Sequence, residues 1–192
     1  MRKVLLTTAL VLLFALTTFA QGPSMLKPPK GSPMAIVVFE DLQCPMCRMT
    51  SPVVENAAKS YKIPLVRYDF PLPMHNWSFD AAVMARYFEH QSKDLGDAFR
   101  VFIFEHQTEI FPTNLRSFAD RFAAEHKTSL PFVVHPKGEL ASLVKADKDL
   151  GTRIGINHTP TVYVVSTNPS RPYTEVTKPA EELYQTIDAM KR

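Results

Sequence analysis

The chain has 192 residues, with 22 Lys and Arg against 19 Asp and Glu and a formal net charge of +3 at neutral pH. So small a net charge gives no electrostatic reason to expect nucleic acid or an anionic membrane as a partner. The length suffices for one domain with a proper core, and two cysteines are too few for a scaffold held together by disulfides. We therefore expect a single domain whose cysteines serve chemistry.

The first 20 residues have the pattern of a secretory signal peptide. Arg2 and Lys3 precede an apolar run from Val4 to Leu16, and the segment 18–20 offers small residues at the two positions that a signal peptidase inspects. We predict cleavage after Ala20 and export to the periplasm or another extracytoplasmic space, where disulfides persist. An uncleaved membrane anchor is the alternative, although the run is short for a membrane-spanning helix.

Hydrophobic periodicity divides the rest of the chain into strands and helices. Residues 21–33 hold four prolines and two glycines, which describes an extended linker. The predicted strands are apolar or β-branched and cover 35–39, 63–70, 161–165 and 173–176. The predicted helices each have an apolar face: one over 46–61, three short ones capped by Ser78, Ser92 and Thr113 or Asn114, one over 139–154, and a last one capped by Thr177 with Pro179 in its first turn. This order predicts a small mixed sheet with helices on both faces and a helical block, about 72–150, inserted at its middle.

The only two cysteines, Cys44 and Cys47, lie three residues apart between the first predicted strand and the first predicted helix. The free N–H groups and the dipole at a helix N-terminus stabilise a thiolate, which lowers the pKa of a cysteine there. Cys44 is therefore the candidate nucleophile, followed by Pro45 and Met46. Cys47, one helical turn on and further buried, is the candidate resolving thiol that attacks a mixed disulfide.

Other roles of a Cys-x-x-Cys pair have less support in this sequence. A structural disulfide would close so small a loop that it would remove little entropy from the unfolded chain. Zinc would need two further ligands, for which His75 and His158 are the candidates. Covalent haem attachment needs a histidine directly after the second cysteine, where this chain has Arg48. Haem is excluded, and the other two roles remain alternatives.

Two motifs, Phe39–Cys47 (FEDLQCPMC) and Gly155–Thr161 (GINHTPT), together with the order of the elements, resemble the DsbA-like branch of the thioredoxin superfamily. The resemblance implies an α/β thioredoxin-like fold over residues 34–192, a central mixed sheet flanked by helices, with an inserted helical subdomain. It also implies a cis peptide bond between Thr159 and Pro160, facing the cysteines. Cis is cheap only before proline, and the backbone of Thr159 would then be free to pair with an extended substrate.

At three positions the sequence departs from the pattern of this family. Val38 stands six residues before the first cysteine, where many relatives have a buried acid that accepts a proton from the resolving thiol; Glu40 or Asp41 are the nearest substitutes. Met46 stands where DsbA has a histidine that stabilises the thiolate, so we expect a weaker oxidant. His158 replaces the usual glycine two residues before the proline, and either supports the thiolate with its charge or faces solvent.

The loop after the second predicted strand holds His75 and the only tryptophan, Trp77. We interpret it as a helix-entry loop packed by Trp77, with no chemical step that needs His75.

The resemblance implies an exported thiol–disulfide oxidoreductase whose redox group is the Cys44–Cys47 disulfide, without further cofactor or metal. We expect a monomeric dithiol oxidase that acts on unfolded or partly folded exported proteins with cysteines, is recycled by a membrane redox partner and binds no nucleic acid. One alternative is a disulfide reductase or isomerase, which a membrane electron donor would keep reduced. The other, from a different class, is a redox-inert client-binding module or holdase.

Overall fold

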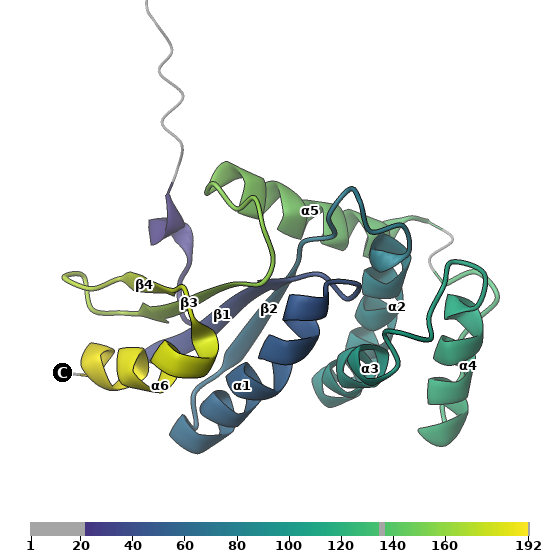
Figure 1. The fold of residues 1–192 in the computed structure, drawn as a ribbon, viewed down its shortest axis with the longest axis horizontal. Helices are drawn as coiled ribbons and strands as arrows, with labels where there is room; N and C mark the ends of the chain where they lie inside the picture. Colours follow the sequence, from purple (N-terminus) through teal and green to yellow (C-terminus); the bar gives the residue numbers. More distant parts are fainter. Residues whose placement is uncertain (1–21, 135–136, 192) are drawn as a thin grey trace, which may run out of the picture.

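The computed structural model describes residues 22–134 and 137–191, so the predicted signal segment lies outside the described residues. Strands and helices follow one another in the predicted order (Figure 1). The strands are β1 (Met34–Glu40), β2 (Leu65–Asp69), β3 (Thr161–Ser166) and β4 (Tyr173–Val176). The helices are a short 3-10 helix, η1 (Pro23–Met25), and the α-helices α1 (Pro45–Tyr61), α2 (Ser78–Gln91), α3 (Lys93–Glu105), α4 (Leu115–Glu125), α5 (Glu139–Arg153) and α6 (Pro179–Met190).

The four strands form one mixed sheet in the order β2-β1-β3-β4. β1 runs parallel to β2, with Ile36 beside Leu65, and antiparallel to β3, with Val38 opposite Val162. Every residue of β1 is buried, as expected for a continuous apolar run in a central strand. Parallel strands need a crossover, and α1 supplies it between β1 and β2. The predicted mixed sheet is confirmed.

Helices cover both faces of the sheet (Figure 1). α1 and α6 pack on one face, where Val54 and Leu183 meet side chains of β1 and β3. α5 packs on the other face through Ile154 and the residues that follow it. Gly151 permits this close approach, because a Cβ atom there would lie 2.7 Å from the ring of Phe70. The sheet therefore has an apolar layer on each side.

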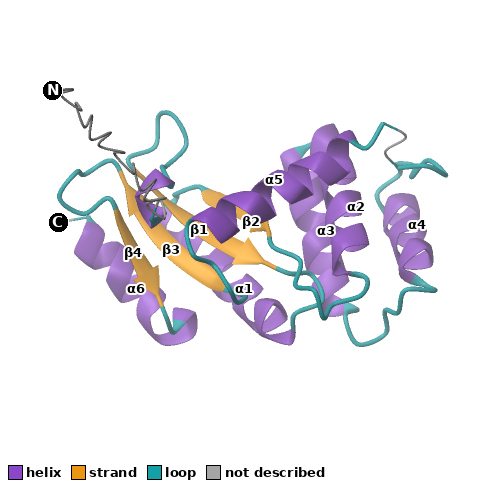
Figure 2. Ribbon diagram, turned by 90° about the horizontal axis from the view of Figure 1, so that it is seen from above, coloured by secondary structure: helices purple, strands orange, loops and turns teal. Residues whose placement is uncertain are grey.

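The inserted helices α2, α3 and α4 lie beyond the edge of the sheet formed by β2 (Figure 2). Their apolar faces meet in an aromatic cluster, in which the rings of Phe88, Phe99 and Phe122 have centroids 4.7 to 5.1 Å apart. The same core includes Cys44 and Cys47. The two cysteines therefore lie where the end of the sheet meets the helical insertion.

The predicted cap of α3 is confirmed, because the hydroxyl of Ser92 accepts a hydrogen bond from the backbone N–H three residues on. The predicted caps of α2 and α6 are wrong in detail. Ser78 is instead the first residue of α2, and its hydroxyl donates to the buried carboxylate of Asp41. The N-cap of α6 is Lys178, one residue after Thr177. The Ser78 hydroxyl therefore bonds to Asp41, which is distant in sequence, and does not cap its own helix.

The proline-rich segment before β1 is not a free tether over its whole length. Leu26, which follows η1, is only 2% exposed and packs with the residues of β1, β3 and α5 on one face of the sheet. One apolar side chain therefore fastens this segment to the domain, although its composition predicts an extended linker.

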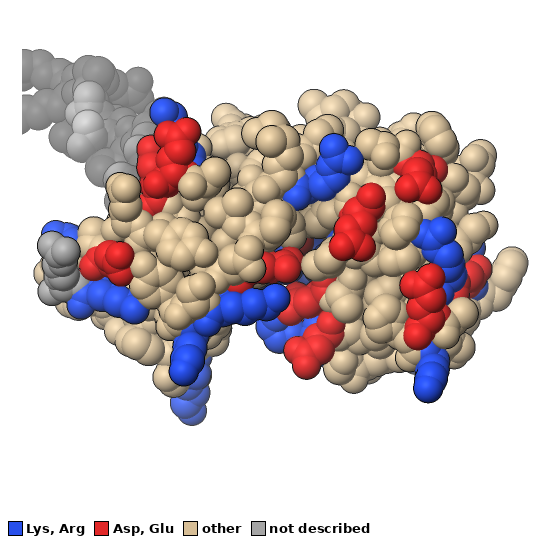
Figure 3. Space-filling view, turned by 60° about the horizontal axis from the view of Figure 1, so that its bottom comes forward, with Lys and Arg blue, Asp and Glu red and all other residues tan. Residues whose placement is uncertain are grey.

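The surface carries charges of both signs side by side, as one face of the molecule shows (Figure 3). This mixture agrees with the small net charge and gives no broad basic face on the side in view. Among the residues that the structure describes, none of the helices combines the length and the apolar character that a membrane span requires.

Candidate redox site

The turn between β1 and α1 brings the two cysteines together at one helix end. Cys44 is the N-cap residue of α1, and Cys47 lies in its first turn. Pro45 occupies the first helical position, where a missing N–H costs nothing and the fixed φ suits a helix start. Both cysteines are free thiols in the structure. The sequence-based placement at a strand-to-helix junction is confirmed.

The surroundings of Cys44 favour its thiolate, although its side chain is not widely open to solvent. The residue is 6% exposed, and its Sγ lies 3.4 Å from the carbonyl oxygen of Thr159. A hydrogen bond from the Cys47 thiol is the main cause that lowers the pKa of Cys44 to about 5. Burial acts in the opposite direction, while the Thr159 hydroxyl and the backbone N–H groups of Cys47 and Met46 add to the lowering. At neutral pH Cys44 is therefore ionised.

Cys47 has the opposite character. It is 2% exposed, and burial raises its pKa well above that of an ordinary thiol. The neighbouring Cys44 raises the pKa further, because two adjacent thiolates repel each other. One group acts the other way: the backbone N–H of Asp41 donates to Cys47 Sγ at 3.4 Å and lowers the pKa. One turn of helix thus holds a thiolate and a thiol.

The loop before β3 faces Cys44, and the Thr159–Pro160 peptide bond is cis, as predicted. Thr159 is buried, and its hydroxyl forms no hydrogen bond within the described residues, although Thr159 lowers the pKa of Cys44. His158 is exposed, and the one side-chain hydrogen bond it forms within the described residues joins its Nδ1 to Asn157 Oδ1 at 2.9 Å. This favours the interpretation of His158 as a solvent-facing residue.

Glu40 is the buried acid beneath the pair, at a position two residues after Val38. Glu40 and Cys47 line one small void, and the side chain of Glu40 is 2% exposed. Its carboxylate receives Arg67 Nη1 at 2.7 Å and lies 3.3 Å from Arg100 Nη1. Two guanidinium groups therefore bind Glu40, and its negative charge raises the pKa of Cys47.

The same arginines belong to an ionic layer between the sheet and the helical insertion, which we call the ionic joint: Glu40, Arg67, Asp69, Arg86 and Arg100. Arg100 Nη1 donates to Asp69 Oδ1 at 2.6 Å, and Arg86 Nε donates to Asp69 Oδ2 at 2.6 Å. Burial alone would raise the pKa of Asp69, but these two guanidinium groups hold it below its usual value. The sequence did not indicate these pairs, because the partners come from β1, β2, α2 and α3.

Two glutamines fasten the turn that carries the cysteines to the helical insertion. Gln107 Nε2 donates to the carbonyl oxygens of Leu42 at 2.9 Å and Cys44 at 3.1 Å. Gln43 Oε1 accepts from the backbone N–H of Trp77 at 3.0 Å. Sequence reasoning missed Gln107, since no local pattern distinguishes it from an exposed glutamine. Trp77 is buried in the core of the insertion, which confirms it as the packing residue of its loop.

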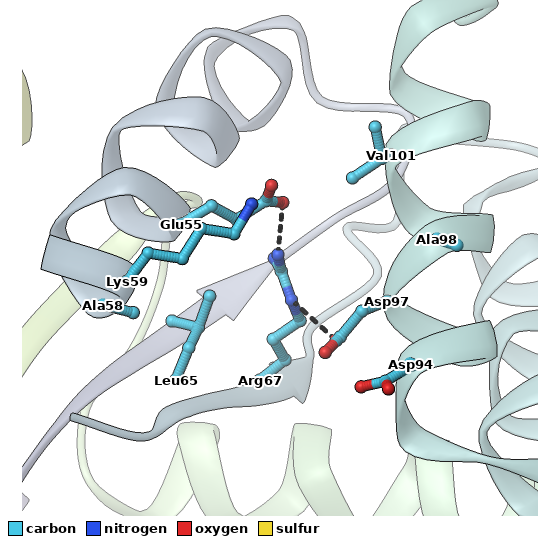
Figure 4. Close-up of a pocket in the computed structure, with 9 residues that line it drawn as sticks. All are labelled: Glu55, Ala58, Lys59, Leu65, Arg67, Asp94, Asp97, Ala98 and Val101. Carbon is cyan, nitrogen blue, oxygen red and sulfur yellow. Dashed lines mark hydrogen bonds and ion pairs between the residues drawn. The ribbon is translucent and has the colours of Figure 1, made fainter. Parts of the chain in front are cut away.

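The zinc alternative has no support in the part of the chain that the structure describes, where no three His, Cys, Asp or Glu side chains are grouped to hold a metal ion. A cavity of about 340 Å³ opens between α1 and α3, and neither cysteine lines it (Figure 4). Arg67 at its floor donates to Glu55 at 2.7 Å and lies 3.3 Å from Asp97. This cavity is therefore separate from the cysteine site.

Comparison with known proteins agrees with this architecture. The family model described as thioredoxin matches residues 29–189. DsbA2 from Pseudomonas aeruginosa is 21% identical with a TM-score of 0.61, over 83% of this chain and 89% of that chain. Alpha-DsbA1 from Wolbachia pipientis is 18% identical with a TM-score of 0.66, over 85% and 88%. Oxidised BdbD from Bacillus subtilis is 20% identical with a TM-score of 0.62, over 85% and 88%. No curated protein matches the sequence. The predicted thioredoxin-like fold with a helical insertion is confirmed.

Proposed function

We propose that this chain, which belongs to the thioredoxin family, is a protein thiol–disulfide oxidoreductase that uses Cys44 and Cys47 as its redox pair. The observation that carries the proposal is the opposite shift of the two thiols: the pKa of Cys44 falls to about 5, while that of Cys47 rises. A structural disulfide or a holdase needs no such difference. Thiol exchange needs it, because one sulfur must be the good nucleophile and leaving group.

Oxidation of a client proceeds in two exchanges at Cys44. A client thiolate attacks Cys44 of the oxidised pair, so that a mixed disulfide forms and the Cys44–Cys47 bond breaks, with its electron pair going to Cys47. A second client thiolate then attacks the client sulfur, and Cys44 leaves as a thiolate. The client gains a disulfide, and the protein gains two electrons. Because Cys44 is stabilised as a thiolate, the reduced form is stabilised, and this favours a dithiol oxidase over a reductase.

Two features beside Cys44 support contact with unfolded protein clients. Met46 and Met49 lie on the first turns of α1 and are 55% and 63% exposed, and methionine is an adaptable apolar side chain suited to varied partners. Across from them, the Thr159 backbone lies next to the Cys44 sulfur and suits pairing with an extended chain. We assign client binding to this surface, with Thr159 and Pro160 as its backbone part.

The proposal includes export by residues 1–20, a periplasmic or similar compartment, a membrane redox partner that reoxidises the pair, and a monomeric protein of one domain over 34–192. The signal-like pattern of residues 1–20 supports this part of the proposal, because an exported chain reaches a compartment where disulfides form and persist.

The direct test is oxidation of a reduced peptide with two cysteines by oxidised protein. The wild type should oxidise the peptide, and Cys44→Ser should abolish oxidation. Cys47→Ala, offered the same peptide in its disulfide form, should capture it as a mixed disulfide: Cys44 attacks the peptide disulfide, one peptide sulfur leaves as a thiolate, and the protein has no second thiol to release the other. A Cys44→Ser variant that keeps full effect on clients would indicate a holdase. The resting redox state in the producing cell separates the directions: mostly oxidised protein supports the oxidase, and mostly reduced protein supports the reductase or isomerase.

A further inference from the structure

Asp41 follows β1 directly, and its carboxylate is completely buried. Each of its oxygens faces two donors. Oδ1 accepts from the backbone N–H of Gln43 at 2.7 Å and the hydroxyl of Ser78 at 2.5 Å. Oδ2 accepts from the backbone N–H of Leu72 at 2.7 Å and lies 2.7 Å from Nδ1 of His75. Four converging donors match the four acceptor sites of a carboxylate, and they make Nδ1 of His75 the donor nitrogen.

His75 differs from the other partners of Asp41 because it alone can carry a positive charge. Among the described residues, neither a lysine nor an arginine pairs with Asp41, whereas the nearby Glu40 is held by Arg67 and Arg100. A buried carboxylate without a charged partner depends on its hydrogen bonds to stay in place. His75, whose side chain is 18% exposed, is therefore the contact most able to hold or release Asp41.

Asp41 also touches both cysteines through its backbone. Its N–H donates to Cys47 Sγ at 3.4 Å, and its carbonyl oxygen accepts from the N–H of Cys44 at 3.0 Å. The first of these bonds lowers the pKa of Cys47 against the effect of burial. The Asp41 side chain is short, so its carboxylate and its backbone N–H move together. Loss of a bond that fixes the carboxylate would therefore turn the peptide unit that carries this N–H.

We propose that His75 is a positioning residue for Cys47: by holding the Asp41 carboxylate, it keeps the Asp41 N–H directed at the Cys47 sulfur. This inference rests on the proposed function. The sulfur of Cys47 carries negative charge whenever the Cys44–Cys47 bond forms or breaks. When a mixed disulfide is resolved, the Cys47 thiolate attacks Cys44, the Cys44–Cys47 bond forms, and the partner sulfur leaves with the electron pair of the broken bond. In the opposite direction Cys47 itself leaves as the thiolate, so the N–H assists both.

The test separates the two cysteines in one reaction of reduced protein with oxidised glutathione. In the first step Cys44 attacks the glutathione disulfide, releases one glutathione thiolate and keeps the other glutathione as a mixed disulfide. In the second step Cys47 expels it. Acid quenching at short times and mass spectrometry of the intact protein count the reduced, mixed and oxidised forms, which gives a rate for each step.

His75→Ala should slow the second step about tenfold, the scale of one hydrogen bond to a charged group, and should leave the first step within about twofold. The mixed disulfide should accumulate, and the second step should need a higher pH. His75→Asn can place its amide N–H near the position of Nδ1 and should restore most of the rate, whereas His75→Gln places its amide nearer to Nε2 and should stay slow. The control is His90→Ala, an exposed histidine in the last turn of α2, which should leave both steps unchanged.

Three outcomes would overturn the inference: an unchanged second step in His75→Ala, equal slowing of both steps, or no difference between the asparagine and glutamine variants. If His75→Ala does not fold, the asparagine and glutamine pair decides alone, because both keep a polar side chain. If reduced wild type does not react with oxidised glutathione at Cys44, the proposed function fails and the inference falls with it. A wild type that becomes oxidised leaves the result to the variants.

Discussion

Two neighbouring regions at the end of β1 bury negative charge in opposite ways. At the start of α1, the groups that favour the Cys44 thiolate are a thiol, a hydroxyl and backbone N–H groups, all of them uncharged. In the ionic joint, Glu40 and Asp69 are each held by two arginines, as Arg100 contacts both. Within the described residues no cationic side chain contacts the Cys44 sulfur, whereas Glu40 and Asp69 are paired with arginines.

This difference matches what each region has to do. A carboxylate held by guanidinium groups gains strong charge-assisted hydrogen bonds that fix its position. The ionic joint therefore fastens the helical insertion to the sheet. A thiolate held by neutral donors is stabilised at neutral pH and can still give up its electron pair to a disulfide sulfur. The start of α1 is therefore suited to thiol–disulfide exchange. The ionic joint beside it keeps the exchange site in place.

The largest effect is expected from breaking the ionic joint. Arg100→Leu should lower the free energy of unfolding by about 3 to 5 kcal/mol, because it leaves the buried carboxylates of Glu40 and Asp69 short of a counter-charge. Denaturant unfolding measures this loss. Arg153→Leu, at an exposed position in the last turn of α5, is the control and should change stability little. An Arg100→Leu variant as stable as wild type would mean that the joint holds nothing together.

The next effect concerns Cys44 and is linked to pH. The pKa of Cys44 is about 5 in the folded protein and about 8.5 in an unfolded chain, so folding favours the thiolate. For a lowered pKa the contribution to stability is complete above about 8.5 and is lost as the pH falls through about 5. At pH 7 reduced wild type should exceed Cys44→Ser by about 2 to 3 kcal/mol, and at pH 4 the difference should vanish. A pH-independent difference in unfolding free energy between the two proteins would contradict the thiolate.

A smaller effect is expected at Thr159. Its hydroxyl helps to lower the pKa of Cys44 and has no other partner among the described residues. Thr159→Val keeps the shape and removes the donor, so the pKa of Cys44 should rise by about one unit. Thr159→Ser, which keeps the hydroxyl, should stay close to wild type. The pH dependence of alkylation at Cys44 measures the pKa in both variants. Equal pKa values would mean that the hydroxyl does not stabilise the Cys44 thiolate.

The smallest effects are expected at Met46 and His158, two positions at which the sequence departs from the pattern of the DsbA-like branch. Met46→His should move the redox potential toward more oxidising values by about 20 mV, a small change because position 46 is more than half exposed and its charge is screened. His158→Gly should leave the potential unchanged, because His158 bonds to Asn157 and not to Cys44 within the described residues. Glutathione-buffer titration checks both, starting from a parent value on the order of −150 to −220 mV. A shift of Met46→His toward reducing values would contradict the electrostatic argument.

The parts of the fold that local patterns specify could be predicted from the sequence. The continuous apolar run predicts β1, apolar residues at steps of three and four predict the faces of α2 to α4, and the boundary between run and helix places the two cysteines at a helix start. The Thr159–Pro160 cis bond is predicted from the resemblance of its segment to a motif of the family. Both predictions depend on residues that are neighbours in the sequence, so the cysteine pair and the cis proline could be identified without a structure.

The parts that depend on distant partners could not be predicted. Arg100 has the sequence context of an exposed helix residue, and only the fold brings it to Asp69 of another element. Ser78 has the sequence of a helix cap, but the buried carboxylate of Asp41 takes its hydroxyl. His75 fits a packing loop equally well, since nothing near it in sequence marks Asp41 as its partner. Buried polar contacts of this kind need the tertiary structure.

The central claim is that one turn of α1 holds an ionised Cys44 beside a protonated Cys47, and titration of reduced protein tests it most directly. Brief alkylation with iodoacetamide from pH 3.5 to 9, followed by peptide mapping, gives the reactivity of each thiol separately, with thiolate absorbance at 240 nm as a second measure. We expect Cys44 to reach half of its maximal reactivity near pH 5, with Cys47 unmodified throughout that range. A midpoint for Cys44 above pH 8, or faster modification of Cys47 at neutral pH, would contradict the account.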